Sequence, residues 1–250
     1  MKKAFCNEFY KGRHAYVWAI PLAFICITIL WQVFCNQNLK SEELAYGYTY
    51  LLYQFPVMNS LMMPLMIAVL ASRLCDMEIK GDTIKQLYTL QSRKAFYDSK
   101  FFHEAFFLLL FVIGECAIIC LCGTIYHYTD NLNMIAFGQF GAVTFVVGLV
   151  ILMLQHFLSL TFTNQIIPLI IGLAGSFLGL FAMFLPHTVS RWIIYSYFAE
   201  FQTAKMSWDS NTREIWFTPL SFPHLKFVLL IILGVALFII SQKIFAKKEV

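Results

Sequence analysis

The chain reads FFHEAFFLLLFVIGECAIICLCG from Phe101 to Gly123, an almost unbroken apolar run. A helix needs about 20 apolar residues to cross the hydrocarbon core of a membrane, and this run is long enough. Outward from it lie five further runs of this kind, at residues 15–34, 51–71, 136–160, 166–185 and 227–246. The pattern predicts a single all-α polytopic membrane domain with six transmembrane helices.

The composition favours the same class. Hydrophobic residues make up 60% of the chain, charged residues 13%, and the mean hydropathy is +0.70. Soluble domains carry about 25% charged residues. The lipid bilayer is therefore the expected solvent, and the net charge of +4 reflects topology and gives no support to a nucleic-acid partner.

The distribution of Lys and Arg predicts the orientation. With the N-terminus inside the cell, thirteen of the 18 basic residues fall on cytoplasmic segments and five on the opposite side. Basic residues concentrate in cytoplasmic loops, so both termini are predicted to be cytoplasmic. The first run is longer than the apolar part of a signal peptide and lacks a small-residue cleavage site, so we expect a retained helix.

The connection at residues 72–100, SRLCDMEIKGDTIKQLYTLQSRKAFYDSK, holds ten charged residues. Ile84, Leu87 and Tyr88 share one helical face with Gln91. This spacing predicts a short amphipathic helix on the cytoplasmic side. An ordinary solvated loop is the alternative.

Five residues in and beside this connection carry a family resemblance: Glu78, Thr83, Leu87, Arg93 and Lys100. They resemble the signature that follows the second helix of ABC type-2 exporter permeases. The N-terminal Glu8-x-x-Lys11 and the six-helix plan also fit that family. The length of the chain and the sequence of this connection are most similar to those of lantibiotic-immunity permeases, which protect bacteria against peptide antibiotics.

Two positions depart from the family pattern. Asp82 stands where Gly is usual, and Leu90 stands where Pro is usual.

The resemblance implies a membrane subunit driven by a separate ABC ATPase, whose groove receives a coupling helix. The implied coupling residues are Glu78, Thr83, Ile84, Leu87, Tyr88, Arg93 and Lys100. A second permease chain, identical or related, is also implied, as is a bacterial plasma membrane. The chain has no Gly-x-x-x-x-Gly-Lys-[Ser/Thr] phosphate loop, so catalytic and cofactor-binding residues are not expected; ATP and Mg²⁺ belong to the partner.

Four polar residues fall inside the predicted spans: Asn59, Glu115, Gln155 and His156. Intramembrane polar groups are candidates for function by default. Glu115 and His156 are predicted as a possible interhelical pair or as part of a polar translocation surface. Structural hydrogen bonding between helices is the competing interpretation, also for Asn59.

Small residues and prolines mark two of the spans. Gly172, Gly175 and Gly179 form a seam along which another helix can approach closely, in this subunit or in a second one. Pro56 and Pro64 interrupt the backbone hydrogen bonding of the second span and favour bends there.

The segment at residues 186–226 is rich in aromatic residues and is predicted to be extracellular. Trp192, Trp208 and Trp216 are candidates to face an amphipathic peptide arriving from outside. Interfacial anchoring explains such aromatics equally well.

Metal ligation is not predicted. Cys116 and Cys120 lie one helical turn apart, but small buried residues are the simpler interpretation. His103-Glu104 begins like a zinc-protease motif, yet Phe107 occupies the place of the second His.

Three function classes remain open. The first is the permease subunit of an exporter that expels a lantibiotic or a similar peptide. The second is a permease for lipid, a polysaccharide intermediate or a small drug. The third is a non-transport membrane protein, either a sensor or an intramembrane protease.

Overall fold

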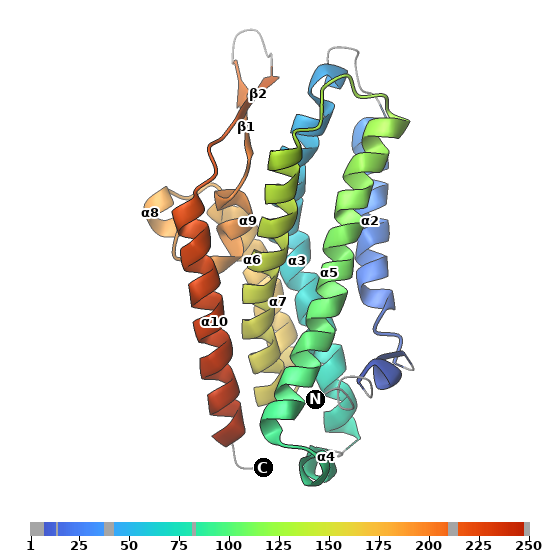
Figure 1. Cartoon of the computed structure of the whole chain (residues 1–250), viewed down its shortest axis with the longest axis vertical. Helices are drawn as coiled ribbons and strands as arrows, with labels where there is room; N and C mark the ends of the chain where they lie inside the picture. The colour runs from blue at the N-terminus through green and yellow to red at the C-terminus, as the bar shows by residue number, and fades with distance from the viewer. Residues whose placement is uncertain (1–7, 14, 38–42, 82–83, 210–214, 248–250) are drawn as a thin grey trace.

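The computed structural model describes residues 8–13, 15–37, 43–81, 84–209 and 215–247. It is an elongated bundle of long helices that lie side by side (Figure 1). The long helices are α2 (Ala19–Asn36), α3 (Gly47–Lys80), α5 (Arg93–Ile125), α6 (Met134–Thr161), α7 (Ile166–Ala182) and α10 (His224–Lys247). The predicted class, a mainly helical polytopic membrane protein, is confirmed.

Five of these helices are long and apolar enough to cross a membrane. The run predicted at residues 166–185 forms α7, which ends at Ala182 after 17 residues. At 1.5 Å per residue it measures about 25 Å, against about 30 Å for the hydrocarbon core. This fifth apolar segment is thus a helix, but a shorter one than the other five.

The predicted boundaries of the connection at residues 72–100 are wrong. Helix α3 continues to Lys80 and α5 already begins at Arg93, so only α4 (Ile84–Leu90) is a separate helix. Hydropathy falls where the lipid ends, but the helix continues because its polar residues find partners. Asp76 and Lys80 pair one turn apart at 2.7 Å. Ser92 caps α5 by accepting a hydrogen bond from the Ala95 N–H.

The segment at residues 186–226 contains a β-hairpin that the all-α prediction missed. Strands β1 (Ala204–Trp208) and β2 (Ile215–Pro219) pair antiparallel, with Trp208 opposite Ile215. Aromatic and β-branched residues in β2 favour a strand. The short elements α8 (His187–Ser190), η2 (Ile194–Ser196) and α9 (Tyr197–Glu200) lie below the hairpin, beside the upper part of the bundle (Figure 1).

The hairpin is held against the beginning of α3 by aromatic contacts. Phe217 lies 5.9–6.3 Å, centroid to centroid, from the rings of Tyr46, Tyr50 and Tyr53. Tyr46 belongs to η1 (Glu43–Tyr46), the short turn that leads into α3. The carboxylate of Asp130 accepts hydrogen bonds from the first backbone N–H groups of α3, which stabilises that helix end.

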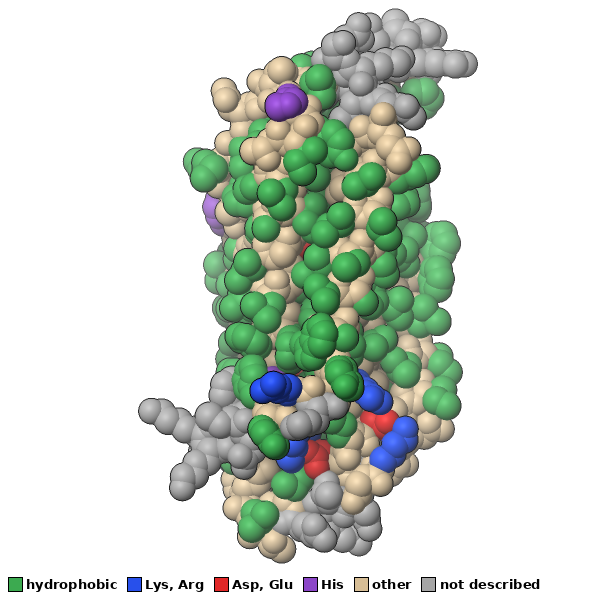
Figure 2. Space-filling view, turned by 90° about the vertical axis from the view of Figure 1, so that its right-hand side faces the viewer, with side chains coloured by type: hydrophobic (Ala, Val, Ile, Leu, Met, Phe, Trp, Pro, Cys, Tyr) green, Lys and Arg blue, Asp and Glu red, His purple; other side chains and the backbone are tan. Residues whose placement is uncertain are grey.

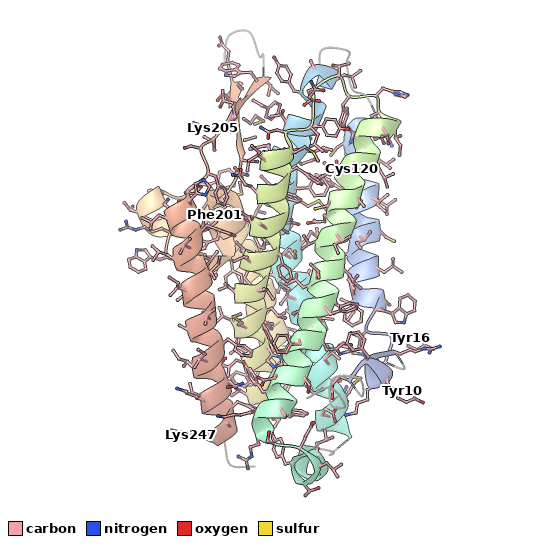
Figure 3. All side chains as sticks on the ribbon, in the orientation of Figure 1. Tyr10, Tyr16, Cys120, Phe201, Lys205 and Lys247 are labelled. Atoms are coloured by element: carbon pink, nitrogen blue, oxygen red, sulfur yellow. The ribbon has the colours of Figure 1, made fainter. Side chains whose placement is uncertain are left out.

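We call the two ends of the molecule the hairpin end and the α4 end. The helix at residues 8–13, α4 and the last turn of α10 all lie at the α4 end (Figure 1). Figure 2 shows one face, on which hydrophobic side chains cover the middle and charged side chains gather toward the α4 end. Tyr10 and Tyr16 project outward there, 68% and 67% exposed, as aromatics do at a membrane interface (Figure 3).

The glycine seam of α7 packs inside this chain. A side chain at Gly172 would meet Ala68 of α3, and one at Gly175 would meet the ring of Tyr195. Gly179 lies against the backbone carbonyls of Ser60 and Tyr195. Pro64 has no N–H to donate to the carbonyl four residues before it, which is that of Ser60. Helix α7 therefore approaches α3 where a proline has left a carbonyl without its helical donor.

Changing Gly179 to Ala should destabilise the bundle. The added methyl carbon would lie 2.7 Å from the Tyr195 carbonyl oxygen and 2.9 Å from that of Ser60, and neither can rotate away. Overpacking of this kind costs about 1–3 kcal/mol. Gly138→Ala is the matched control, because its methyl group would meet nothing within 4 Å. Thermal unfolding in detergent should separate the two variants, and an equal melting temperature would contradict the close approach.

Candidate functional site: a buried ion cluster

Four charged residues from three separate helices meet at the α4 end, and we call them the ion cluster: Glu8, Lys11, Glu78 and Lys100. The Lys11 ammonium lies 2.8 Å from Glu78 and 3.4 Å from Glu8. The Lys100 ammonium lies 3.0 Å from Glu8 and 3.4 Å from Glu78. The four formal charges cancel.

Lys100 is the centre of the cluster, because it is fully buried. Its ammonium donates to Glu8, to Glu78 and to the backbone carbonyl of Leu74. An ammonium group has three donors, and all three are used. A buried charge is tolerated only when it is paired and hydrogen-bonded in this way. The cluster therefore fixes the start of α5 to the end of α3 and to the helix at residues 8–13.

Helical spacing explains why these residues meet. Leu74 and Glu78 lie one turn apart on α3, and Glu8 and Lys11 share one face of the helix at residues 8–13. The structure thus places Glu78 and Lys100, both taken from the family signature, inside the protein. They do not lie on an outward-facing docking surface.

Helix α4 rests on this end of the bundle through the face that was predicted to be apolar. Leu87 and Tyr88 are half-buried and pack against the cluster of Phe96, Tyr97 and Phe245. The Arg93 guanidinium lies 5.1 Å from the centre of the Tyr88 ring. Burial raises the pKa of Tyr88, and the nearby Arg93 opposes this in part. Leu87 and Tyr88 therefore pack α4 against α5 and α10 of its own chain.

The outward side of α4 carries a different apolar residue. The side chain of Leu90 is 82% exposed, so it projects away from the bundle. Thr83 lies outside the described residues, and so does the side chain of Ile84. Among the side chains of α4 that the structure describes, Leu90 is thus an apolar one that faces outward, and sequence reasoning noted it only as a departure from the family pattern.

The four intramembrane polar residues are all buried, but the predicted partnership of Glu115 with His156 is wrong. Asn59 donates to the Glu115 carboxylate at 2.9 Å, which joins α3 to α5. His156 faces Glu104 instead, with Nδ1 and Oε2 2.8 Å apart. Gln155 donates to the carbonyl of Pro168 at 2.6 Å and joins α6 to α7. These contacts connect helices within the bundle.

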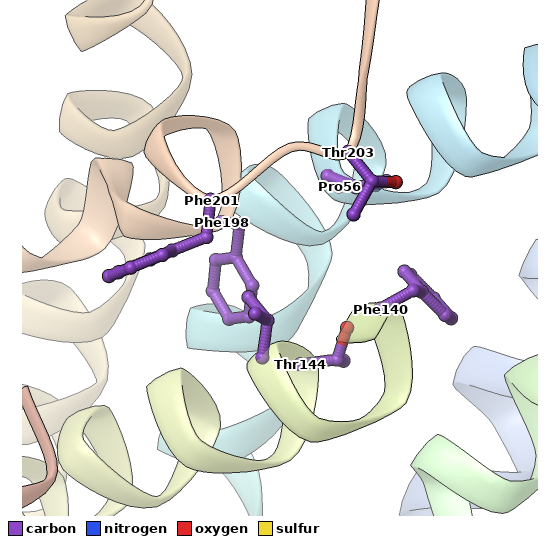
Figure 4. Close-up of a pocket in the computed structure, with 7 residues that line it drawn as sticks. Pro56, Phe140, Thr144, Phe198, Phe201 and Thr203 are labelled. Atoms are coloured by element: carbon purple, nitrogen blue, oxygen red, sulfur yellow. The ribbon is translucent and has the colours of Figure 1, made fainter. Parts of the chain in front are cut away.

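Between α3, α6 and α9 the structure has a shallow hollow, part of it open to the outside (Figure 4). It is lined by Pro56, Phe140, Val143, Thr144, Phe198, Phe201 and Thr203. The three candidate tryptophans lie elsewhere on the surface: Trp192 is 77% exposed, Trp208 63% and Trp216 42%.

Comparison with known proteins identifies the family. The model of the ABC-2 family transporter proteins matches residues 4–179. That range includes the ion cluster, α4, four of the six long helices in full and most of α7. A search of curated proteins finds no match. The chain therefore belongs to the ABC-2 transporter family, as a membrane-spanning permease subunit that works with a separate ABC ATPase.

Proposed function

We propose that this permease exports a lantibiotic or a similar amphipathic peptide and so protects a bacterial cell from it. The observation that carries the export mechanism is the junction at the α4 end. There a short helix with one exposed leucine rests on α5, beside an ion cluster that joins α3, α5 and the helix at residues 8–13.

The coupling would run through α4. An ATPase groove that receives Leu90 would push on α4, whose inner face is packed on Phe96 and Phe245. The ion cluster ties the beginning of α5 to the end of α3, so both helices would move together. Rigid elements with packed contacts transmit such motions well.

The peptide cargo is supported by the outer surface. Trp208, Trp216, Met206, Ile215 and Leu220 are exposed at the hairpin end, and Trp192 is exposed below the hairpin, between α8 and η2. An amphipathic peptide that lies in the outer leaflet would find apolar and aromatic partners there. The hollow between α3, α6 and α9 is too shallow to hold a peptide, so we place the cargo on the outer surface.

The full transporter would contain two permease chains, identical or related, and the ATPase that holds ATP and Mg²⁺. Six crossings with both termini in the cytoplasm complete the proposal. In it, α7 and the short elements α8, η2 and α9 together occupy the fifth crossing, and α10 is the sixth. This arrangement places the hairpin outside the bacterial plasma membrane and α4 inside.

Accessibility labelling checks the orientation. In a background that keeps the buried Cys75 but lacks the other native cysteines, Ser92→Cys should resist membrane-impermeant thiol reagents in intact cells, and Lys205→Cys should react. Both positions are exposed on the protein, so shielding by the membrane is the only expected difference. The reverse pattern would overturn the orientation inferred from Lys and Arg.

Reconstitution tests the function. The permease, its ATPase and any second permease in proteoliposomes should hydrolyse ATP faster when a lantibiotic such as nisin is added. Trp192→Ala should weaken this stimulation, and Trp18→Ala, another exposed tryptophan, should leave it unchanged. Stimulation by phospholipid or by a small drug, with none by the peptide, would favour the second class of cargo. Absence of a copurifying ATPase would remove the exporter mechanism.

A further inference from the structure

Three buried side chains from three different helices converge next to the ion cluster. Cys75 comes from α3, Glu104 from α5 and His156 from α6. The cysteine sulfur, a carboxylate oxygen and an imidazole nitrogen all lie within 4.8 Å of one another. All three side chains are at most 1% exposed.

Hydrogen bonding within the described residues leaves this group unsatisfied. Both Glu104 oxygens and both His156 nitrogens are buried without a hydrogen-bond partner there. His156 Nδ1 and Glu104 Oε2 are only 2.8 Å apart, yet their orientation is not that of a hydrogen bond. Buried polar atoms almost always have a partner, so a bound ligand would explain these atoms.

The nearest strong cation does not supply that ligand. Lys100 lies one helical turn from Glu104 on α5, but its three donors are already directed at Glu8, Glu78 and the Leu74 carbonyl. Glu104 is therefore a buried carboxyl whose neighbouring ammonium is fully engaged elsewhere. The His156 imidazole, 2.8 Å from Glu104, is the partner that the described residues offer, and a metal ion held by both side chains would balance the buried carboxylate.

We propose that Cys75, Glu104 and His156 bind a zinc ion. Thiolate, imidazole and carboxylate are the three protein donors that zinc prefers, whereas the hard ions Mg²⁺ and Ca²⁺ avoid sulfur. One thiolate, one carboxylate and a neutral imidazole carry two negative charges, which Zn²⁺ cancels. A three-residue set leaves the fourth tetrahedral position to water or to another ligand.

The surroundings would hold such a metal ion in place. The edges of Tyr97 and Phe101 meet the His156 ring, with centroids 4.6 and 5.8 Å away. These contacts hold the imidazole plane and limit access of water. The ion would connect α3, α5 and α6 about one turn deeper in the bundle than the ion cluster. It would keep the ends of these helices together while α4 is pushed.

The test uses the full-length permease purified in detergent through a tag without histidine, so that no tag can bind metal. Elemental analysis should find about one zinc per chain. Removal with a chelator should lower the melting temperature, and added zinc should restore it. Adding Co²⁺ to the metal-free protein should produce the near-ultraviolet band of a cobalt–thiolate bond.

Cys75→Ser and His156→Gln should each reduce zinc content or zinc affinity at least about tenfold and abolish the cobalt–thiolate band. Cys122→Ser is the matched control, because Cys122 is a buried cysteine in a different cluster near the hairpin end. It should retain both signals.

Two results would overturn the proposal. One is a wild-type protein that contains no zinc and gives no cobalt–thiolate band. The other is full zinc content in both ligand variants. The native-protein measurements do not depend on the variants, so a variant that fails to fold leaves the test intact.

Discussion

Replacing Lys100 by Met should destabilise the permease strongly and abolish transport. The substitution leaves two buried carboxylates, Glu8 and Glu78, with only Lys11 to balance them. Removing one partner from a buried ion pair costs about 3–5 kcal/mol, which is a large share of the stability of an ordinary domain. Thermal unfolding in detergent and the amount of protein in the membrane measure the effect.

Two companion variants show whether charge balance is the cause. Lys94→Met removes the same charge from an exposed site and should be nearly neutral. The double variant Lys100→Met with Glu8→Gln leaves Lys11 and Glu78 as a balanced pair, so it should recover part of the lost stability. If Lys94→Met were as harmful as Lys100→Met, or if the double variant recovered nothing, the cluster would not act as described.

Replacing Leu90 by Asp should break the connection to the ATPase while leaving the permease folded. Leu90 is 82% exposed, so the change costs the isolated chain little. In an ATPase groove the new carboxylate would be buried and unpaired, which costs several kcal/mol. Since 1.4 kcal/mol corresponds to a factor of ten, association should weaken by at least about a hundredfold. Copurification of the ATPase and ATP-dependent transport are the measurements.

Leu220→Asp makes the same chemical change at the hairpin end and should leave ATPase binding intact. Leu87→Asp has a different expected signature. Leu87 packs against α5 and α10, so its change should loosen α4 and lower thermal stability as well. Normal ATPase binding by Leu90→Asp would mean that α4 is not the docking element.

The sequence was sufficient for the features that depend on lipid. Long apolar runs predict helices because lipid offers no partner for free backbone groups. The glycine seam predicts close packing because small residues let two helix backbones approach each other in a membrane. The charged ends of α3 and α5 were predicted as part of the connection at residues 72–100, because hydropathy reports where lipid ends and not where a helix ends. The hairpin was missed because its two strands have only five residues each. Their strand pattern is weak beside the many aromatic residues that were assigned to the membrane interface.

The candidate site was only partly predictable. Glu78 and Lys100 were identified through family resemblance, but their burial depends on packing that no local pattern contains. Cys75, Glu104 and His156 are separated by 29 and 52 positions along the chain, so no motif spacing brings them together. The local prediction paired Glu115 with His156 because both lie within apolar runs. The rotation of each helix about its axis decides the actual partners.

The length of α3 has a mechanical consequence. Its 34 residues form one continuous helix, about 51 Å long, that passes through Pro56 and Pro64. One end contacts the hairpin through Tyr50 and Tyr53, and the other bears Glu78. If α3 tilts as one body despite its two prolines, it acts as a lever: a tilt of about 10° about one end displaces the other by about 9 Å over that length. A small rotation imposed by a nucleotide-driven motor on one side of the membrane would thus become a sweep of nearly two helical turns on the other.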